Sequence, residues 1–206
     1  SKTSFCFIKN ILPVSHASCN SLVEKSRLRY NICIMFCIQT DTRYIEKVRN
    51  AIRDNVLLDG EEVFMPVTER MRKIDGKWQR VLVPMFFGYL FITSDHPDEL
   101  YVRLHSMLGR TIFKYVKLIR DDEYIIPLSK EDERIVTELS DENHIIKASM
   151  GYIKGDRLYV TDGPLHGHEG EVVRIDRHKR IAILAMNFLG EKRNITIGLE
   201  VVRKEK

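Results

Sequence analysis

The sequence has few cysteines and no long apolar run. No stretch reaches the roughly 18 consecutive apolar residues that a transmembrane helix requires. Its four cysteines, Cys6, Cys19, Cys33 and Cys37, form no C-x2-C pair, which is the spacing that structural zinc sites prefer. These absences exclude a membrane-spanning helix and argue against a zinc-stabilised fold. We expect a cytoplasmic protein whose cysteines are reduced and mostly structural.

What is present is the composition of an ordinary globular chain, with 206 residues of which 44% are hydrophobic and 30% charged. This length allows one medium domain or two small ones. The net charge of +4 is divided unevenly, at +4 for residues 1–29, −3 for residues 30–150 and +3 for residues 151–206. A nucleic-acid-binding surface is therefore expected in the last segment or on local faces.

The first 29 residues show neither helical nor strand periodicity. Their apolar start, FCFIKNILPV, is interrupted by Lys9, Asn10 and Pro13 before it reaches the length of a signal peptide, so we expect no secretory signal. Ser1 in place of a methionine suggests a processed or tagged chain. We interpret residues 1–29 as a poorly ordered N-terminal extension.

Residues 30–142 alternate between strand and helix patterns. The run ICIMFCI predicts a buried strand, and Asp41 or Thr42 is expected to cap a helix that ends near Asp54. The runs EEVFMPVTERMRKI and KWQRVLVPM are predicted strands joined by Asp75-Gly76, which is a strong hairpin signal. The runs GYLFITS and RTIFKYVKL predict two further strands.

Two more helices are predicted in this region from their start signals. Pro97 is typical of a first helical position, and Leu100, Leu104 and Met107 follow it on one face. Ser129 is expected to cap a helix through about residue 139. Strands and helices in this order predict an α+β sandwich of sheet and helices.

After a short linker at residues 143–151, the pattern is that of strands alone. The runs DRLYVT, GEVVRID, RIAILAMN, KRNITIG and EVVRK are separated by turns at 163–170, 178–179 and 190–191. Five short strands predict a small barrel over residues 152–206, because closure removes the exposed edges of a small sheet. Asp162-Gly163-Pro164 is turn chemistry, and Gly163, Gly167 and Gly170 suit a tight corner.

The spacing of this corner resembles the KOW motif, which ribosomal proteins also carry. In the preceding region, VPMFFGYLFI resembles the Phe-Pro-Gly-Tyr-apolar motif of the NusG-family N-terminal domain. The runs MFCIQT, VFMPVTE, LGRTIFKYV and PLSKEDERIV follow the order seen in that family. By this resemblance the chain is identified as a NusG-type transcription elongation factor. It implies an NGN domain at 30–142, a linker at 143–151 and a five-stranded, SH3-like KOW barrel at 152–206.

The resemblance implies a protein that catalyses no reaction, needs no cofactor and binds the clamp helices of RNA polymerase. By motif position, an apolar clamp-binding patch would consist of Phe36, Tyr89, Phe91 and Phe113. Strand alternation places Tyr89 and Phe91 on one face, although core packing is the alternative for all four, and above all for Phe36 and Phe113. We expect the protein to act as a monomer.

Two departures resemble a specialised paralogue, the LoaP group of antiterminators, rather than the general factor. In the general factor, the turn before the fourth strand of the barrel resembles Ile-Phe-Gly, and its aromatic residue contacts Rho and a ribosomal protein. Here this turn reads Phe188-Leu189-Gly190, with leucine at the aromatic position, which puts those contacts in doubt. The linker is also short, and the CIQT turn together with the basic barrel tips resembles this group. A general NusG factor and a ribosome-associated, rRNA-binding KOW protein are the alternatives.

Basic residues supply the candidate nucleic-acid contacts, with solvated surface charge as the alternative. The resemblance to LoaP favours a leader-RNA hairpin as the ligand of the barrel turns, whose candidates are Arg174, Arg177, His178, Lys179, Arg180, Lys192 and Arg193. Arg43, Lys47 and Arg53, on or near the first helix, are candidates for contact with non-template DNA. His166 and His168 have no third ligand at a suitable spacing, so no metal site is expected.

Overall fold

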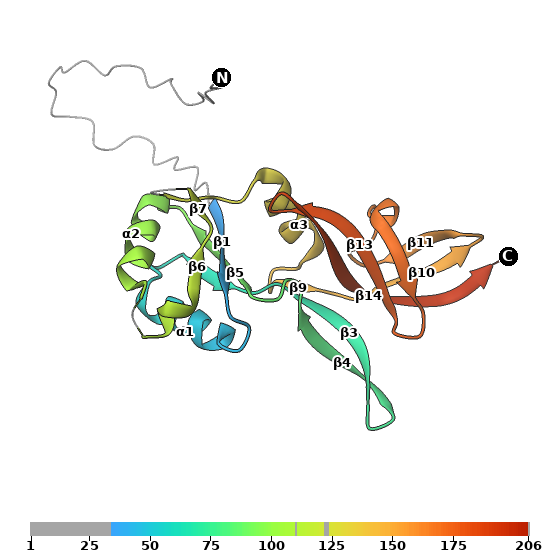
Figure 1. The fold of residues 1–206 in the computed structure, drawn as a ribbon. Coiled ribbons are helices and arrows are strands. Elements are labelled where there is room, and N and C mark those ends of the chain that lie inside the picture. Colours follow the sequence, from blue (N-terminus) through green and yellow to red (C-terminus); the bar gives the residue numbers. More distant parts are fainter. Residues whose placement is uncertain (1–33, 110, 122–123, 206) are drawn as a thin grey trace, which may run out of the picture. The chain divides into compact units, whose positions relative to one another are not determined.

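The structure, a computed structural model, describes residues 34–109, 111–121 and 124–205. The expected extension at residues 1–29 and Cys6, Cys19 and Cys33 lie outside the described residues. The described residues belong to one compact unit, and Figure 1 shows the order of their elements. Within them, three α-helices accompany sheets of four, five, three and two strands, which agrees with the expected α+β class.

The four-stranded sheet is antiparallel and has the strand order β2-β5-β1-β6. Its strands are β1 (Ile34–Thr40), β2 (Glu62–Phe64), β5 (Tyr89–Ser94) and β6 (Val116–Leu118). The central strands β1 and β5 are apolar on both faces, as the run ICIMFCI predicted, so each face packs into a separate hydrophobic cluster.

Helices α1 (Ile45–Asn55) and α2 (Pro97–Met107) cover one face of this sheet. Val48, Ile52, Leu100 and Leu104 are fully buried there, in one cluster with alternate residues of β1 and β5. The start of α2 at Pro97 is confirmed. The expected cap of α1 is wrong, because Asp41 accepts hydrogen bonds from Arg43 and the helix begins four residues after it.

The third helix, α3 (Lys130–Leu139), begins as predicted. The Ser129 hydroxyl oxygen accepts a hydrogen bond from the Asp132 amide at 3.1 Å, which satisfies one of the free amides of the first turn. The Asp132 carboxylate in turn accepts from the Ser129 hydroxyl at 2.7 Å. Only a tenth or less of Asp132 is exposed, which becomes important for the site below.

The β3–β4 hairpin confirms the Asp75-Gly76 turn. Strands β3 (Val67–Ile74) and β4 (Lys77–Pro84) pair antiparallel, and the turn residues have φ values of 51° and 79°. Positive φ at both central residues is the type I′ geometry that matches strand twist. The hairpin extends away from the four-stranded sheet in Figure 1, and β9 (Ile145–Ile146) pairs parallel to β3.

Two predicted strands are shorter than expected. The run EEVFMPVTERMRKI is divided at Met65-Pro66 into β2 and β3, which belong to different sheets, because proline supplies no amide to a ladder. The run RTIFKYVKL is mostly a 3-10 helix, η1 (Thr111–Tyr115), and only Val116–Leu118 form a strand. A two-stranded ribbon, β7 (Arg120–Asp121) and β8 (Tyr124–Ile125), follows it.

The C-terminal sheet, which we define as residues 149–205, has the strand order β11-β10-β14-β13-β12. Five strands were predicted and the sheet has five, but they are not the same five, and closure of the sheet into a barrel stays a prediction. The expected linker contains β9 and the start of β10 (Ser149–Lys154), and the last two predicted strands form one long strand, β14 (Glu191–Glu205). The others are β11 (Arg157–Asp162), β12 (Val172–Asp176) and β13 (Ile181–Phe188).

The glycine-rich corner between β11 and η2 (Glu169–Glu171) packs against Ser149, the first residue of β10. Gly163 has a φ of 99°, and a Cβ there would lie 2.7 Å from the Ser149 Cα. The Ser149 hydroxyl oxygen accepts a hydrogen bond from the Leu165 amide at 3.0 Å, and the Leu165 side chain is fully buried. The corner therefore requires glycine both for its backbone conformation and for the close approach of another strand.

A second close approach predicts a destabilising substitution. A Cβ on Gly198, within β14, would collide with the Glu69 carbonyl oxygen of β3 and with the Ala148 side chain. Gly198→Ala should therefore force β14 away from β3 and lower the free energy of unfolding by about 1–3 kcal/mol. Urea denaturation measures this effect. Gly170→Ala is the matched control, since a Cβ there meets nothing within 4 Å, and an equal loss in both variants would contradict the packing argument.

Candidate functional site

The four aromatic residues of the expected clamp-binding patch do not share one surface. Tyr89 and Phe91 lie on the face of the four-stranded sheet opposite α1 and α2. Phe36 and Phe113 lie in the cluster beneath those helices, where both are almost fully buried. The expected single patch is therefore wrong. Alternate residues of β1 and β5 point to opposite faces, which separates Phe36 from Tyr89 and Phe91. Phe113 lies in the 3-10 helix at residues 111–115, on the side of α1 and α2. Of the four, only Tyr89 and Phe91 lie on the face of the sheet that α1 and α2 leave uncovered.

The Tyr89–Phe91 face is covered by aromatic packing in this structure. Only 8% of Tyr89 and none of Phe91 is exposed. Phe86, just before β5, stacks on Phe188 at the end of β13, with ring centroids 4.1 Å apart. Phe91 lies 6.1 Å from the same Phe188 ring. The expectation of an exposed aromatic face does not hold here, because the β13–β14 hairpin packs on it.

Two polar contacts accompany this cover. The Arg193 guanidinium lies 5.1 Å from the centroid of the Tyr89 ring and donates a hydrogen bond to the Tyr89 hydroxyl at 3.0 Å. The Asp132 carboxylate accepts a hydrogen bond from the Leu189 amide at 2.9 Å. Leu189 and Gly190 have φ values of 53° and 75°, so the tip of the hairpin is a type I′ turn with leucine in the left-handed region.

Cys37 lies on the same face as Phe91 and is a free, buried thiol. Burial raises the pKa of this thiol to about 12, because a thiolate would lose its hydration. The thiol therefore stays protonated at neutral pH and packs as a small apolar group. This agrees with the structural role expected for the cysteines, of which Cys37 is the one among the described residues.

Phe87 is an exposed aromatic residue that the motif comparison missed. It is 63% exposed, although Phe86 before it and Tyr89 after it are buried. The adjacent Gly88 has a φ of 81°, and a Cβ there would lie 2.9 Å from the Thr40 carbonyl oxygen. This glycine turns the chain so that Phe87 points outward before β5 begins. The departure of FFGY from the Phe-Pro-Gly-Tyr pattern was the available signal.

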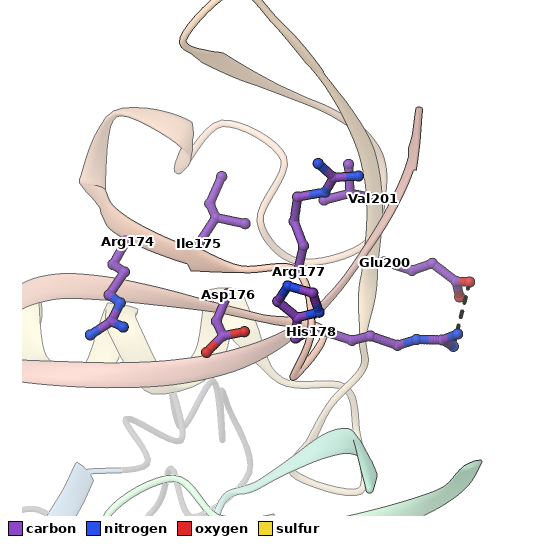
Figure 2. A pocket seen from close by; sticks show the side chains of 8 residues that line it. Arg174, Ile175, Asp176, Arg177, His178, Glu200 and Val201 are labelled. Carbon is purple, nitrogen blue, oxygen red and sulfur yellow. Dashed lines mark ion pairs between the residues drawn. The ribbon is translucent and has the colours of Figure 1, made fainter. Parts of the chain in front are cut away.

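The basic residues of β12 and the following turn surround a shallow hollow of about 660 Å³. Figure 2 shows side chains of this hollow, which Arg174, Arg177, His178 and Arg180 line together with two carboxylates, Asp176 and Glu200. The dashed line in Figure 2 marks the ion pair from Arg180 to Glu200, at 3.7 Å. Four of the predicted RNA-binding residues are thus brought together.

The carboxylates of this hollow neutralise only part of its charge. Asp176 accepts a hydrogen bond from the Lys179 amide at 2.9 Å and lies 3.9 Å from the Lys179 ammonium. The first of these contacts lowers the pKa of Asp176 most. Arg174 and Arg177 are exposed and form no ion pair with any residue that the structure describes. Their contact with RNA stays a prediction.

The second predicted basic turn does not keep both of its cations free. Lys192 is exposed, but Arg193 lies over the Tyr89 ring, with 29% of its side chain exposed and its Nε without a hydrogen-bond partner among the described residues. Arg193 was a candidate for RNA contact, with solvated surface charge as the alternative, and here its guanidinium packs on Tyr89 instead of extending into solvent. The quadrupole of the aromatic ring attracts the guanidinium and favours this position.

The three cations proposed for DNA contact occupy different surroundings. Arg43 precedes α1 and forms a bidentate ion pair with Asp41, which holds the pKa of that carboxyl at about 2. Arg53 pairs with Asp54 at 3.0 Å. Lys47 is exposed and has no ion-pair partner within the part of the chain that the structure describes. Their contact with DNA stays a prediction.

The described residues hold no group of three or more potential metal ligands. His168 has carboxylates as neighbours, with Glu171 at 2.9 Å and Glu138 at 4.0 Å. This places it at the edge of the cleft between α3 and the C-terminal sheet. None of the helices in the described ranges is long and apolar enough to cross a membrane.

Comparison with known families defines the class of this protein as a factor of the transcription machinery. The family described as "Transcription termination factor nusG" matches residues 35–137, which is half of the chain. The chain therefore belongs to the NusG family of transcription termination and antitermination factors. Proteins of this family are transcription factors rather than enzymes, and they interact with RNA polymerase.

Individual relatives are similar over most of the chain. The "Transcription termination/antitermination protein NusG" of Rickettsia typhi is 23% identical over 96% of each chain, as is that of Rickettsia prowazekii. The protein of the same name from Pasteurella multocida is 21% identical over 69% of this chain and 76% of its own. A solved structure described as "Domain interaction in Thermotoga maritima NusG" has a TM-score of 0.45 and 19% identity, covering 82% of this chain and 94% of that chain.

Proposed function

We propose that this protein is a cytoplasmic transcription antitermination and processivity factor that acts as a monomer. It binds the clamp helices of RNA polymerase and suppresses pausing or termination. The observation that carries this proposal is the Tyr89–Phe91 face. It is an aromatic surface of the sheet at the position of the family motif, and in this structure a hairpin of the same chain covers it. Aromatic side chains in such a face are the usual anchors for a partner helix.

Binding at this face requires the β13–β14 hairpin to move away. The contacts that must be broken are the Phe86–Phe188 stack, the Arg193–Tyr89 hydrogen bond and the Asp132–Leu189 hydrogen bond. All three contacts are made by residues at the tip of this hairpin. Phe87 stays 63% exposed beside this cover, so we propose it as the first aromatic residue to meet the polymerase.

Leu189 supports a specialised paralogue of the LoaP type over a general factor. It occupies the position of the aromatic residue in the general factor, and its amide is bound to Asp132. A leucine cannot offer the ring contact that an aromatic residue would offer there. We propose that the NGN and KOW domains meet within residues 143–151, and that the KOW domain contacts a leader-RNA hairpin through the hollow of Arg174, Arg177, His178 and Arg180.

The RNA contact makes a quantitative prediction. If the basic turns neutralise about three to five phosphates, the logarithm of the affinity should fall against the logarithm of salt with a slope of about 2–4. Lys192→Ala should lower that slope by about 0.7. Arg193→Ala is the matched control and should leave it unchanged, because this guanidinium lies on Tyr89. Fluorescence anisotropy across a salt series measures all three slopes, and a salt-independent affinity would contradict the phosphate contacts.

The remaining alternatives make different predictions for co-purification. Capture of the tagged protein from cells should bring RNA polymerase with it and should enrich one leader RNA above others. Enrichment of polymerase with RNA from all operons would instead identify a general elongation factor. Enrichment of ribosomes without polymerase would identify an rRNA-binding protein and overturn the proposal.

A further inference from the structure

The β3–β4 hairpin carries the only tryptophan of the sequence, and the proposed function does not account for it. Trp78 lies in β4, two residues after the Gly76 turn, and is 41% exposed. The Arg180 guanidinium lies 4.7 Å from the centroid of its ring. This contact joins the hairpin to the turn between β12 and β13, and therefore to the basic hollow of Figure 2.

The contact with Arg180 places a guanidinium against the Trp78 ring. Arg180 has a φ of 53°, which is uncommon for a residue other than glycine, and its guanidinium also lies 3.7 Å from the Glu200 carboxylate. The cation is thus held from one side by a carboxylate and from the other by the indole ring. Trp78 therefore presents a flat aromatic surface that contacts Arg180 and remains partly open to solvent.

Two cations lie beside this ring on its own face of the hairpin. Lys73 is directly opposite Trp78 in the strand register, and Met71 is opposite Arg80. Because alternate residues of a strand share a face, Lys73 and Arg80 flank Trp78. Arg80 is 76% exposed and only 3.9 Å from Glu69, and Lys73 has no ion-pair partner among the residues that the structure describes.

We propose that Trp78 is a stacking platform for an unpaired RNA base, so that the β3–β4 hairpin and the basic hollow bind one RNA together. Aromatic rings and arginine planes stack on bases, while flanking cations neutralise phosphates. Trp78, Arg180, Lys73 and Arg80 supply both kinds of contact on adjoining surfaces. This inference rests on the proposed RNA contact and adds a base-binding residue outside the C-terminal sheet.

The single tryptophan allows a direct test with the full-length protein. A stem–loop RNA with a loop of about ten unpaired nucleotides is added while tryptophan emission is recorded, and anisotropy measures the affinity of the same labelled RNA. We expect the stem–loop to quench the emission and a fully paired duplex of the stem sequence to leave it unchanged. Single-stranded DNA of the loop sequence is added in parallel and should bind more weakly than the RNA.

Variants separate stacking from general charge. Trp78→Ala should weaken stem–loop binding by about tenfold, and Trp78→Phe should restore most of the affinity because phenylalanine keeps an aromatic face. Lys130→Ala, at an exposed cation on α3, should change nothing. Circular dichroism confirms that each variant is folded, and Trp78→Leu provides a second variant that keeps an apolar side chain without a ring.

The possible results are distinguishable. Stem–loop binding without quenching, or with equal affinity in Trp78→Ala, would overturn the stacking platform and leave the RNA contact of the proposed function standing. Equal binding and quenching with single-stranded DNA would overturn the assignment to RNA. No binding of any nucleic acid by the full-length protein would overturn both the inference and the proposed RNA contact.

Discussion

Tyr89→Asp should abolish measurable binding of this protein to the clamp helices of RNA polymerase. The substitution would place an unpaired carboxylate in an interface that excludes water, which costs about 2–5 kcal/mol of binding free energy. Tyr89 is preferable to Phe91 for this test, because Phe91 is fully buried and its substitution would also damage the core. Binding is measured by titration of a clamp-helix fragment against the folded full-length variant.

A matched control is available on the other side of the four-stranded sheet. Val102 of α2 is 63% exposed, so Val102→Asp adds the same charge at an exposed apolar position away from the Tyr89–Phe91 face. This variant should bind like the unmodified protein. Tyr89→Phe should bind at least as well, because it keeps the ring and removes the hydrogen bond from Arg193 that helps to hold the cover. Undiminished binding by folded Tyr89→Asp would refute the interface.

Arg103→Met should lower the free energy of unfolding by about 3–5 kcal/mol, because it leaves a buried carboxylate without its partner. The Glu61 side chain is 1% exposed, and the Arg103 guanidinium donates to both of its oxygens at 2.7 Å. Ser94 and the Leu58 amide donate two further hydrogen bonds to the same carboxylate. Arg134→Met, which removes an exposed pair with Glu138, should cost only about 0.3–0.5 kcal/mol.

The same network predicts the direction of a pH effect. Burial alone would raise the pKa of Glu61, but the hydrogen bonds from Arg103, Ser94 and Leu58 outweigh it and lower the pKa below the usual value of 4.5. The ionised network therefore stabilises the fold above the unfolded-state pKa, and this contribution is lost as pH falls through the folded-state pKa. In Arg103→Met the buried carboxyl is easier to protonate, so its deficit should narrow on acidification. Urea denaturation at a series of pH values measures the difference in unfolding free energy between the variant and the unmodified protein. A difference that widens as pH falls would contradict this account.

Local chemistry allowed the sequence to predict several elements correctly. Asp75-Gly76, Pro97 and Ser129 act within a few residues of their own position, so a turn or a helix start could be predicted from them. The β10 strand was missed because its pairing partners, β11 and β14, are needed to define it, and its own SMGYIK run has no clear alternation. Two predicted strands are one strand, β14, in the structure, because its pairing with β13 and then with β10 is likewise not visible in the local sequence.

The candidate site was less accessible to sequence reasoning than the fold. Alternation correctly separated Tyr89 and Phe91 from Leu90, but it could not show that Phe188 would stack over that face. The contact between Trp78 and Arg180 likewise joins two hairpins that are distant in the sequence. Such contacts depend on how sheets pack, which no local pattern specifies.

Transcription in vitro tests the antitermination proposal most directly. Purified RNA polymerase from the organism that encodes the protein transcribes a template with a leader-RNA hairpin ahead of an intrinsic terminator, with and without the full-length protein. The account predicts that the protein increases readthrough only when the leader hairpin is present, and that Tyr89→Asp removes the increase. Readthrough that is unchanged, or termination that becomes more efficient with the intact leader, would contradict it.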